Sequence, residues 1–250
     1  MTIPDLVRRG VAAGAAAGAL GAIYLWLVVE PVIERALVIE EARGGHSHGA
    51  DGAHEGAAVV SRGVQVAGGL ATTVVVAILF GVVFAIVFAR VRHHLPAATD
   101  HGRSVVLAAL AFGIAALLPA LKIPANPPAV GDPDTVGRRT LIYLLVLLLG
   151  LAVTLGAFTL DRVLRARRLE PDTRVTAVAG AAVLAVVLIL LLVPGSPDVV
   201  PDDVPATLLW EFRVVALGQL VVLWGALGLA FGLLVSRRSA TVGSPRVVAR

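Results

Sequence analysis

The chain has 250 residues, of which 58% are hydrophobic and only 15% are charged, and its formal net charge at pH 7 is +4. Soluble domains carry roughly 25% charged residues, so the composition excludes an ordinary soluble protein. The arginines stand in short clusters at the ends of apolar runs, as they do around membrane helices, so no nucleic-acid partner is expected. The absence of cysteine excludes disulfides, thiolate metal sites and cysteine catalysis.

Six apolar segments are long enough to cross about 30 Å of hydrocarbon at about 1.5 Å per residue. They predict an all-α polytopic protein with six transmembrane helices, which lies in the lipid bilayer of the cell membrane. The predicted spans are residues 10–29, 64–89, 104–121, 140–160, 175–193 and 210–235. We expect one transmembrane domain over residues 1–238 and a polar cytoplasmic tail over residues 239–250.

The distribution of basic residues predicts that both termini are cytoplasmic. The loops and tails on the side of the termini hold 14 arginines, whereas the opposite side holds six basic residues, which is the asymmetry of the positive-inside rule. Acids show the reverse bias, with eleven outside and five inside. An anionic outer face concentrates cations. The alternative is that acids simply tolerate translocation better than arginines do.

The first and last spans contain small residues at four-residue spacing. Gly14 and Gly18 in the first span, and Gly228 and Gly232 in the last, fit the small-xxx-small pattern of closely packed membrane helices. The pattern predicts helix association, either within the chain or with a partner, so a homo-oligomer stays open.

The outer end of the first span carries Glu30, Pro31 and Glu34. The proline stands where the helix leaves the bilayer and is placed to kink it. Glu30 and Glu34 are four residues apart and share a helix face, and carboxylates at a membrane rim often mark ion paths. The alternative is a hydrated interfacial helix end.

The outer loop at residues 42–62 holds the densest cluster of metal-ligand side chains in the sequence. Its candidate ligands are His46, His48, Asp51, His54 and Glu55. Imidazoles and carboxylates bind Co²⁺, Ni²⁺ and Zn²⁺, and the intervening Gly, Ala and Ser residues suit loose capture rather than a rigid site. The alternative is a solvated low-complexity loop with incidental histidines.

The cytoplasmic loop after the second span contains His93, His94 and His101 beside Asp100. These residues are placed to receive an ion that leaves the membrane, with a plain solvated loop as the alternative. No histidine lies within the spans, which excludes a bis-histidine haem and an H-E-x-x-H protease. The chain also lacks a P-loop and a catalytic triad, so no enzyme and no tightly bound cofactor are expected.

The outer loop before the fourth span carries five prolines within residues 119–133. They forbid a helix and impose an extended or re-entrant path, in which unpaired carbonyl groups face water, protein or a cation. Asn126, Asp132 and Asp134 add oxygen ligands for a cation, and Asp134 with Thr135 is placed to cap the fourth helix. We interpret this segment as a shaped outer gate, with a plain linker as the alternative.

The last span opens with the sequence L-W-E-F-R, which ends at Arg213. The tryptophan is an ordinary interfacial anchor. Arg213 lies deeper, and we expect it to pack inward against a carboxylate rather than face lipid.

The His-containing loop, the stretch P-A-L-K-I-P-A-N-P-P-A-V-G-D-P-D-T-V-G-R-R-T and the opening L-W-E-F-R together resemble the CbtA family over residues 1 to about 236. That family comprises predicted cobalt transporter subunits, which are linked to cobalamin metabolism and usually paired with a small His-bearing partner, CbtB. The resemblance implies a six-helix membrane subunit for uptake of Co²⁺. It also assigns capture of the ion to His46, His48 and His54 and a gate to the proline-rich loop.

Two hypotheses about the function follow, one of a transporter and one of an accessory protein. In the first, the chain admits a divalent transition-metal cation, for which the resemblance implies Co²⁺ while the residues themselves leave Ni²⁺ and Zn²⁺ open. The ion passes Glu30, Glu34 and residues 126–134 and leaves near His93 and His94. In the second, the chain is a non-transporting scaffold or accessory subunit, and a partner forms the ion path. The shortage of buried polar ligands favours the second hypothesis, and the cluster of outer ligands favours the first.

Overall fold

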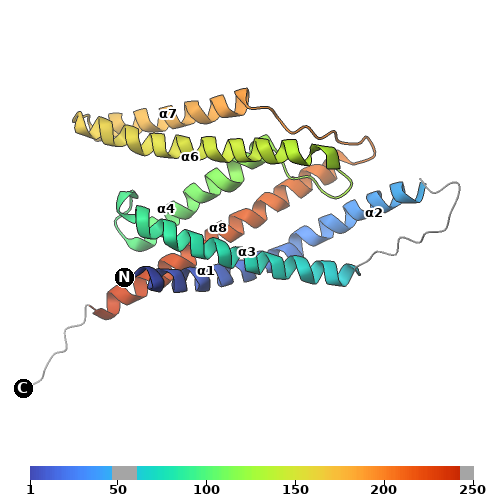
Figure 1. Cartoon of the computed structure of the whole chain (residues 1–250), viewed down its shortest axis with the longest axis horizontal. Coiled ribbons are helices and arrows are strands. Elements are labelled where there is room, and N and C mark those ends of the chain that lie inside the picture. Colours follow the sequence, from blue (N-terminus) through green and yellow to red (C-terminus); the bar gives the residue numbers. More distant parts are fainter. Residues whose placement is uncertain (47–60, 243–250) are drawn as a thin grey trace, which may run out of the picture. The chain divides into compact units, whose positions relative to one another are not determined.

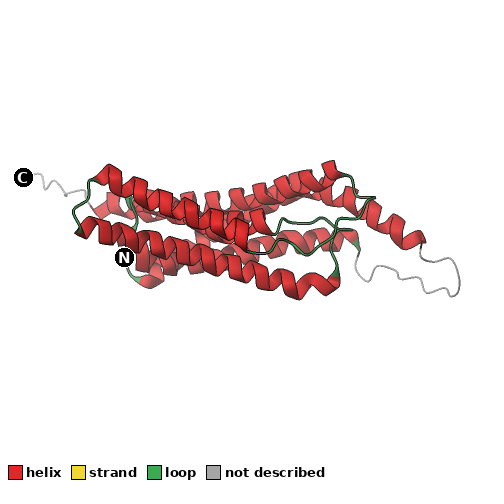
Figure 2. Ribbon diagram, turned by 90° about the horizontal axis from the view of Figure 1, so that it is seen from above, coloured by secondary structure: helices red, strands yellow, loops and turns green. Residues whose placement is uncertain are grey.

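The computed structural model describes residues 1–46 and 61–242, and every regular element in this part of the chain is a helix (Figures 1 and 2). Six helical segments in the described residues are long and apolar enough to cross a membrane. They are Ile3–Arg43, Arg62–His94, Asp100–Lys122, Pro133–Ala166, Pro171–Leu192 and Ala206–Ser236. The all-α class and the six membrane-spanning helices predicted from the sequence are therefore confirmed.

Two of these segments are α-helices interrupted by a π turn. The first consists of α1 (Ile3–Tyr24), the π turn η1 (Leu25–Val29) and α2 (Glu30–His46). The third consists of α4 (Asp100–Phe112), the π turn η3 (Gly113–Leu117) and α5 (Leu118–Lys122). The others are α3 (Arg62–Val91) with the 3₁₀ turn η2 (Arg92–His94), α6 (Val136–Ala166) after the 3₁₀ turn η4 (Pro133–Thr135), α7 (Pro171–Leu192) and α8 (Ala206–Val242).

Both π turns end two residues before a proline, Pro31 in the first segment and Pro119 in the third. A helical proline has no N–H to donate, and its ring crowds the carbonyl group four residues earlier. The wider π turn makes room for the ring, so both helices continue past the proline. The third predicted span, residues 104–121, therefore agrees with the helix, which ends at Lys122. The helix-free path that the five prolines predicted for residues 119–133 is wrong only as far as Lys122.

The carbonyl group that Pro119 leaves without its usual donor is that of Ala115, and Tyr143 of α6 supplies a replacement. The Tyr143 hydroxyl donates to the Ala115 oxygen at 3.1 Å. The hydroxyl group of a tyrosine in one apolar span therefore bonds to the carbonyl group that a proline leaves unpaired in a neighbouring helix.

Replacing Tyr143 with Phe is expected to cost about 1 kcal/mol of stability, because the Ala115 oxygen loses this donor in an apolar setting. The measurement is thermal unfolding of the chain in detergent. Thr159→Ala is the matched control, since the Thr159 hydroxyl bonds within its own helix. In a Pro119→Ala background the restored N–H should make Tyr143→Phe nearly neutral. An equal cost in both backgrounds would contradict the assignment.

The described residues form two compact units. The first unit comprises residues 1–109 together with the chain from residue 214, and the second comprises residues 110–213. The predicted single domain over residues 1–238, and its tail, stay predictions.

In the first unit, α1 and α3 run antiparallel and touch through glycine (Figure 1). A Cβ atom added at Gly14 would lie 2.8 Å from Ile78 Cα, and one added at Gly18 would lie 2.8 Å from Val74 Cα. These neighbours are backbone atoms, which cannot turn aside as a side chain can. The small-residue pattern of the first span therefore packs within the chain.

The small residues of α8 pack in the same unit against α4. A Cβ added at Gly228 would lie 2.5 Å from the Cβ of Ala108, and one added at Gly232 would lie 2.7 Å from Nδ1 of His101. The close approach lets the buried Ser104 hydroxyl donate to the Gly228 oxygen at 2.6 Å. The second glycine pair also serves packing inside the chain.

The second unit contains the α6–α7 hairpin, which packs on α5. Its core consists of Leu118, Ile142, Val146, Ile189 and Val193. Where the hairpin turns, the Asp161 carboxylate forms ion pairs with Arg165 at 2.9 Å and Arg174 at 2.8 Å. The ion pair with Arg174 joins the end of α6 to the beginning of α7, whereas the pair with Arg165 lies within α6.

Most of the apolar surface of α7 is not covered by the rest of its unit. Ile189 is buried, whereas Leu191 and Leu192 are 73% and 76% exposed. An apolar face this extensive is stable against lipid or another membrane subunit and not against water. The exposed surface therefore agrees with the membrane location that the six spans indicate.

Candidate functional site

The structure places the sequence-predicted ligands in three separate parts of the chain. His46 is the last residue of α2. His48, Asp51, His54 and Glu55 lie outside the described residues, so metal capture by this loop stays a prediction.

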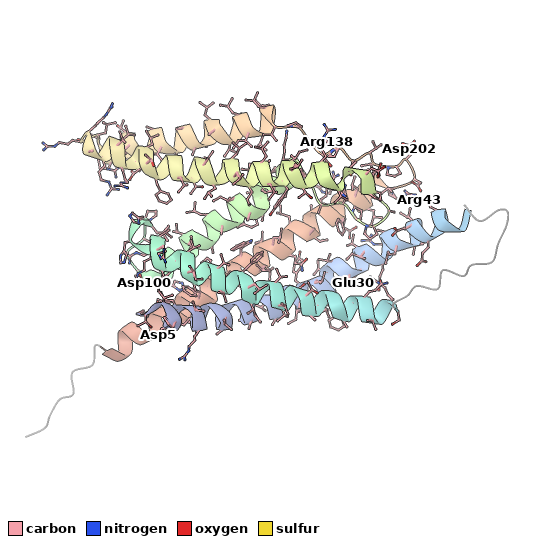
Figure 3. All side chains as sticks on the ribbon, in the orientation of Figure 1. Asp5, Glu30, Arg43, Asp100, Arg138 and Asp202 are labelled. Carbon is pink, nitrogen blue, oxygen red and sulfur yellow. The ribbon has the colours of Figure 1, made fainter. Side chains whose placement is uncertain are left out.

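Glu30 begins α2 and is buried with 8% of its surface exposed (Figure 3). Its carboxylate forms an ion pair with Arg62, the first residue of α3. Glu34, one helical turn further on, is exposed. The two acids predicted to act together are therefore in different environments, and Glu30 is the one that needs a compensating positive charge.

The prolines after α5 lead into a loop with a defined shape. Pro127 is one of the fully buried side chains, and the Val130 N–H donates to the Pro127 oxygen at 3.2 Å. Within this turn Ala129 has φ +69°, a left-handed conformation that costs a non-glycine residue about 1–2 kcal/mol. Surrounding contacts must hold the loop in this strained turn.

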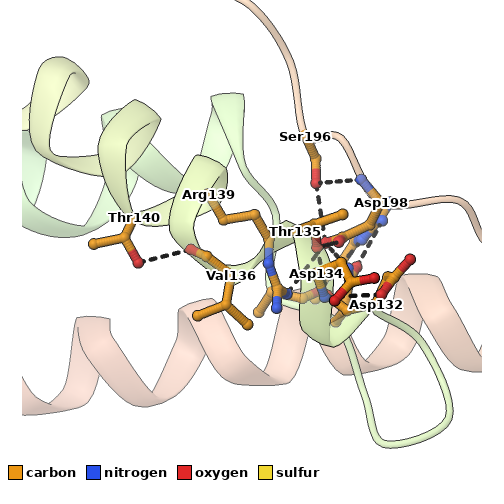
Figure 4. A network of polar contacts seen from close by, with 11 residues as sticks. Asp132, Asp134, Thr135, Val136, Arg139, Thr140, Ser196 and Asp198 are labelled. Carbon is orange, nitrogen blue, oxygen red and sulfur yellow. Dashed lines mark hydrogen bonds and ion pairs between the residues drawn. The ribbon is translucent and has the colours of Figure 1, made fainter.

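Those contacts include a group of polar residues that we call the Asp198 cluster (Figure 4). Its members come from the loop after α5, the beginning of α6, the loop before α8 and the beginning of α8. They are Asn126, Thr135, Arg139, Ser196, Asp198 and Arg213. The cluster fastens the two proline-containing loops of the second unit to each other.

The Asp198 carboxylate is the centre of the cluster, and only 2% of its side chain is exposed. Its Oδ2 atom accepts from Asn126 at 2.9 Å, Ser196 at 3.1 Å and Arg139 at 3.2 Å. Its Oδ1 atom accepts from the Thr135 hydroxyl at 2.6 Å. With both oxygens occupied, this carboxylate acts as a structural anchor.

The same donors keep Asp198 ionised. Burial by itself raises the pKa of Asp198, but hydrogen bonds from Thr135 and Ser196, the charge of Arg139 and the Asp132 backbone outweigh it and lower the pKa below 3.8. The favourable contacts of the anion exceed its desolvation cost.

Asn126 links the anchor to Arg213. The Asn126 amide nitrogen donates to Asp198, and its Oδ1 atom accepts from Arg213 Nη2 at 3.2 Å. Arg213 also donates to the Ala125 oxygen at 3.4 Å. Arg213 therefore does pack inward, but these partners are carbonyl oxygens rather than the carboxylate that we expected.

Asp132 and Asp134 are both exposed, and one of them caps a helical turn. The Asp132 carboxylate accepts from the Asp134 N–H at 2.9 Å, so Asp132 caps η4. Thr135, at the N-cap of α6, forms no side-chain cap bond. The predicted cap by Asp134 and Thr135 is wrong, because the 3₁₀ turn moves the start of the helical run to Asp132.

In the described part of the chain, no three His, Asp or Glu side chains form a group that could hold a metal ion. Between α3 and α4, His93 and His94 are exposed. Asp100, the first residue of α4, forms ion pairs with Arg103 at 2.9 Å and with Arg92 at 3.6 Å. The assignment of Glu30, Glu34, Asn126, Asp132 and Asp134 as ligands stays a prediction.

Sequence reasoning counted Asp198 only as one of many outer acids and missed its central role. The available signal was its setting, Ser196-Pro197-Asp198, in the second of two proline-containing loops that the predicted topology places on the same side of the membrane. Ser and Pro residues directly before an aspartate are typical of a turn that the side chains stabilise.

Six membrane-spanning helices, an exposed apolar surface and polar groups tied into ion pairs define a multi-pass membrane protein. The pattern of the family described as "Probable cobalt transporter subunit (CbtA)" matches residues 3–236. The chain belongs to this CbtA family, and the resemblance carried by its proline-rich loop is confirmed. Membership among transporter subunits implies partner proteins. Neither a curated protein nor a solved structure matches the chain.

Proposed function

We propose that the chain is the membrane subunit through which a divalent transition-metal cation enters the cell, and that this cation is Co²⁺, with Ni²⁺ and Zn²⁺ as the alternatives. The observation that carries this proposal is the family match over nearly the whole chain. The buried carboxylate of Glu30 in a membrane-spanning helix supports it, because a charged group is retained there only for a partner or a function.

The proposed route begins at the outer face, if both termini are cytoplasmic as the arginine distribution predicts. His46, His48 and His54, with Asp51 and Glu55, collect the ion. Glu30 and Glu34 then contact it at the first span, and Asn126, Asp132 and Asp134 contribute at the proline-rich loop. An inside-negative potential favours entry by about 2.3 kcal/mol per charge per 100 mV, and by about twice that for Co²⁺.

Two further parts of the proposal concern the cellular setting. The partner is a small His-bearing membrane subunit of the CbtB kind, and the imported cobalt serves cobalamin metabolism. The broad uncovered apolar surface of α7 leaves ample membrane-embedded area for such a partner.

Purified chain reconstituted in liposomes is expected to take up Co²⁺ with saturation, and faster when the lumen is negative. Changing His46, His48 and His54 together to Ala should lower uptake at limiting Co²⁺ by on the order of tenfold, since local capture is lost. At saturating Co²⁺ the triple variant should match the native chain. A Glu170→Ala, Asp172→Ala control, which changes two exposed acids on the predicted cytoplasmic side, should behave natively at limiting external Co²⁺.

Unchanged uptake by the triple variant at limiting Co²⁺ would remove the capture role. Absence of uptake by the chain alone, with uptake on co-reconstitution of a partner subunit, would assign the ion path to the partner and an accessory role to this chain. Absence of uptake in both arrangements would contradict the proposed function.

A further inference from the structure

The guanidinium group of Arg62 is shared between two oxygen atoms of the first unit. Its Nη2 atom forms an ion pair with Glu30 Oε1, and its Nη1 atom donates to Gln65 Oε1 at 3.3 Å. Both nitrogens belong to one small planar group, so the two oxygens contact the same positive charge. The structure therefore marks a position between Glu30 and Gln65 that is occupied by a cation.

The two charged partners differ in their access to water. The Glu30 side chain is 11% exposed, whereas the Arg62 side chain is 39% exposed. A carboxylate this buried is strongly destabilised when its positive partner is removed. A guanidinium this exposed can move into water at little cost. Glu30 thus requires a cation, while Arg62 does not require Glu30.

The backbone around Glu30 fixes its carboxylate at this depth. The Glu30 N–H bonds to the Leu25 oxygen and closes the π turn. On either side, Val29 is 3% exposed and Val32 is 2% exposed. We therefore expect the Glu30 carboxylate to remain at this depth when the cation opposite it changes.

The local structure of α3 does not itself favour a cation at Arg62. Arg62 is the first residue of the helix, where the helix dipole repels positive charge. Ser61, at the N-cap, forms no side-chain cap bond that would offset this charge. Glu30 and Gln65 therefore hold the guanidinium at this end of α3, and of these two partners only Glu30 carries a negative charge.

We propose that Glu30 is a cation-exchange site, at which Arg62 occupies the carboxylate until a divalent cation displaces it. This inference rests on the proposed function. It concerns how access of the ion to Glu30, the carboxylate of the first span on the proposed route, is regulated. A divalent ion has twice the Coulomb attraction of a guanidinium at the same distance, and the Gln65 oxygen provides a second ligand. The displaced Arg62 side chain moves toward water. Because Arg62 competes for the site, the ion binds weakly enough to be released onward, as conduction requires.

The test measures Co²⁺ binding to the full chain in lipid nanodiscs by equilibrium dialysis. All proteins carry His46→Ala, His48→Ala and His54→Ala, so that loop binding does not contribute. Arg62→Gln should tighten Co²⁺ binding about tenfold, because the competing charge is gone. Arg62→Lys is the matched control and should bind nearly as the parent does. Adding Glu30→Gln to Arg62→Gln should abolish the gain.

Unchanged or weaker binding by folded Arg62→Gln would overturn the proposal. A second measurement covers the case in which that variant does not fold. In the native protein, Co²⁺ should expose Arg62 to an arginine-specific reagent such as phenylglyoxal, and Zn²⁺ should do the same to a degree that follows its affinity. Modification of Arg62 that is unaffected or slowed by Co²⁺ would overturn the proposal.

These measurements separate the exchange site from the proposed function, since neither of them needs transport. A tenfold gain in binding without any liposome uptake would contradict the uptake function alone. Uptake by the native chain without a gain in Arg62→Gln would contradict the exchange site alone.

Discussion

Replacement of Gly81 with Ala is expected to break the packing of α1 against α3, at a cost of about 3 kcal/mol in the free energy of unfolding. The added Cβ atom would overlap the Gly10 carbonyl oxygen and would lie 2.9 Å from Gly10 C and 3.0 Å from Gly14 Cα. All three are backbone atoms, so the helices themselves have to separate. Thermal unfolding and gel filtration in detergent measure the effect.

Gly68→Ala is the matched control, because it lies in the same helix and nothing lies within 4 Å of a Cβ added there. Alanine is the better helix former by about 1 kcal/mol, so this variant should be neutral or slightly more stable than the native chain. The two substitutions are chemically identical and have opposite expected signs. Equal effects at the two positions would show that the glycine contact between α1 and α3 does not hold the first unit together.

Replacement of Asp198 with Ala is expected to release the two proline-containing loops of the second unit. The change leaves Asn126, Thr135 and Ser196 without their common acceptor and leaves Arg139 without its anion. Removing one partner of a buried ion pair costs about 3–5 kcal/mol. Because the Arg139 side chain is 29% exposed and can partly rehydrate, we expect the lower end, about 3 kcal/mol.

Hydrogen exchange and limited proteolysis of the loops at residues 123–135 and 193–205 measure this release. Asp202→Ala, an exposed acid in the same loop, should leave both readouts unchanged. Asp198→Asn should release the loops less than Asp198→Ala does and more than Asp202→Ala does. The amide keeps the shape of the carboxylate, but its NH₂ group faces the donors that the carboxylate accepted from. Loops as protected in Asp198→Ala as in the native chain would contradict the anchoring role.

Acid should produce the same release in the native chain. The folded pKa of Asp198 is below its ordinary value of 3.8, so the unfolded state binds the proton more readily than the folded state does. The stabilisation is therefore fully present above that ordinary value and is lost as the pH falls through the folded pKa. Asp198→Asn should lack this component of the acid response.

The polar atoms of the second unit show that candidate ligands already have protein partners, which the sequence does not reveal. Asn126 offers an amide oxygen, and the sequence suggested it as a metal ligand, yet that oxygen accepts from Arg213 in the structure. Asp132, another suggested ligand, caps a 3₁₀ turn. A donor atom in a loop has several possible partners. Which one it meets depends on a segment far away in the chain, such as residue 198, which is 72 positions from Asn126.

The sequence by itself determined the helical class, the six membrane-spanning segments and the family. Each of these follows from local properties, namely the length of apolar runs and a contiguous motif before the fourth span. The small-residue spacing also predicted close packing correctly, because a helix face is set by residues three to four apart.

Only the tertiary structure decided which charges are buried and what they bind. Glu30 and Glu34 are equivalent in the sequence pattern, yet one is enclosed and paired with Arg62, while the other is exposed. Likewise, Asp198 is enclosed and Asp202 is not. The physical reason is that burial and ion pairing depend on which helices and loops meet in space, whereas periodicity and hydropathy are summed along one segment at a time.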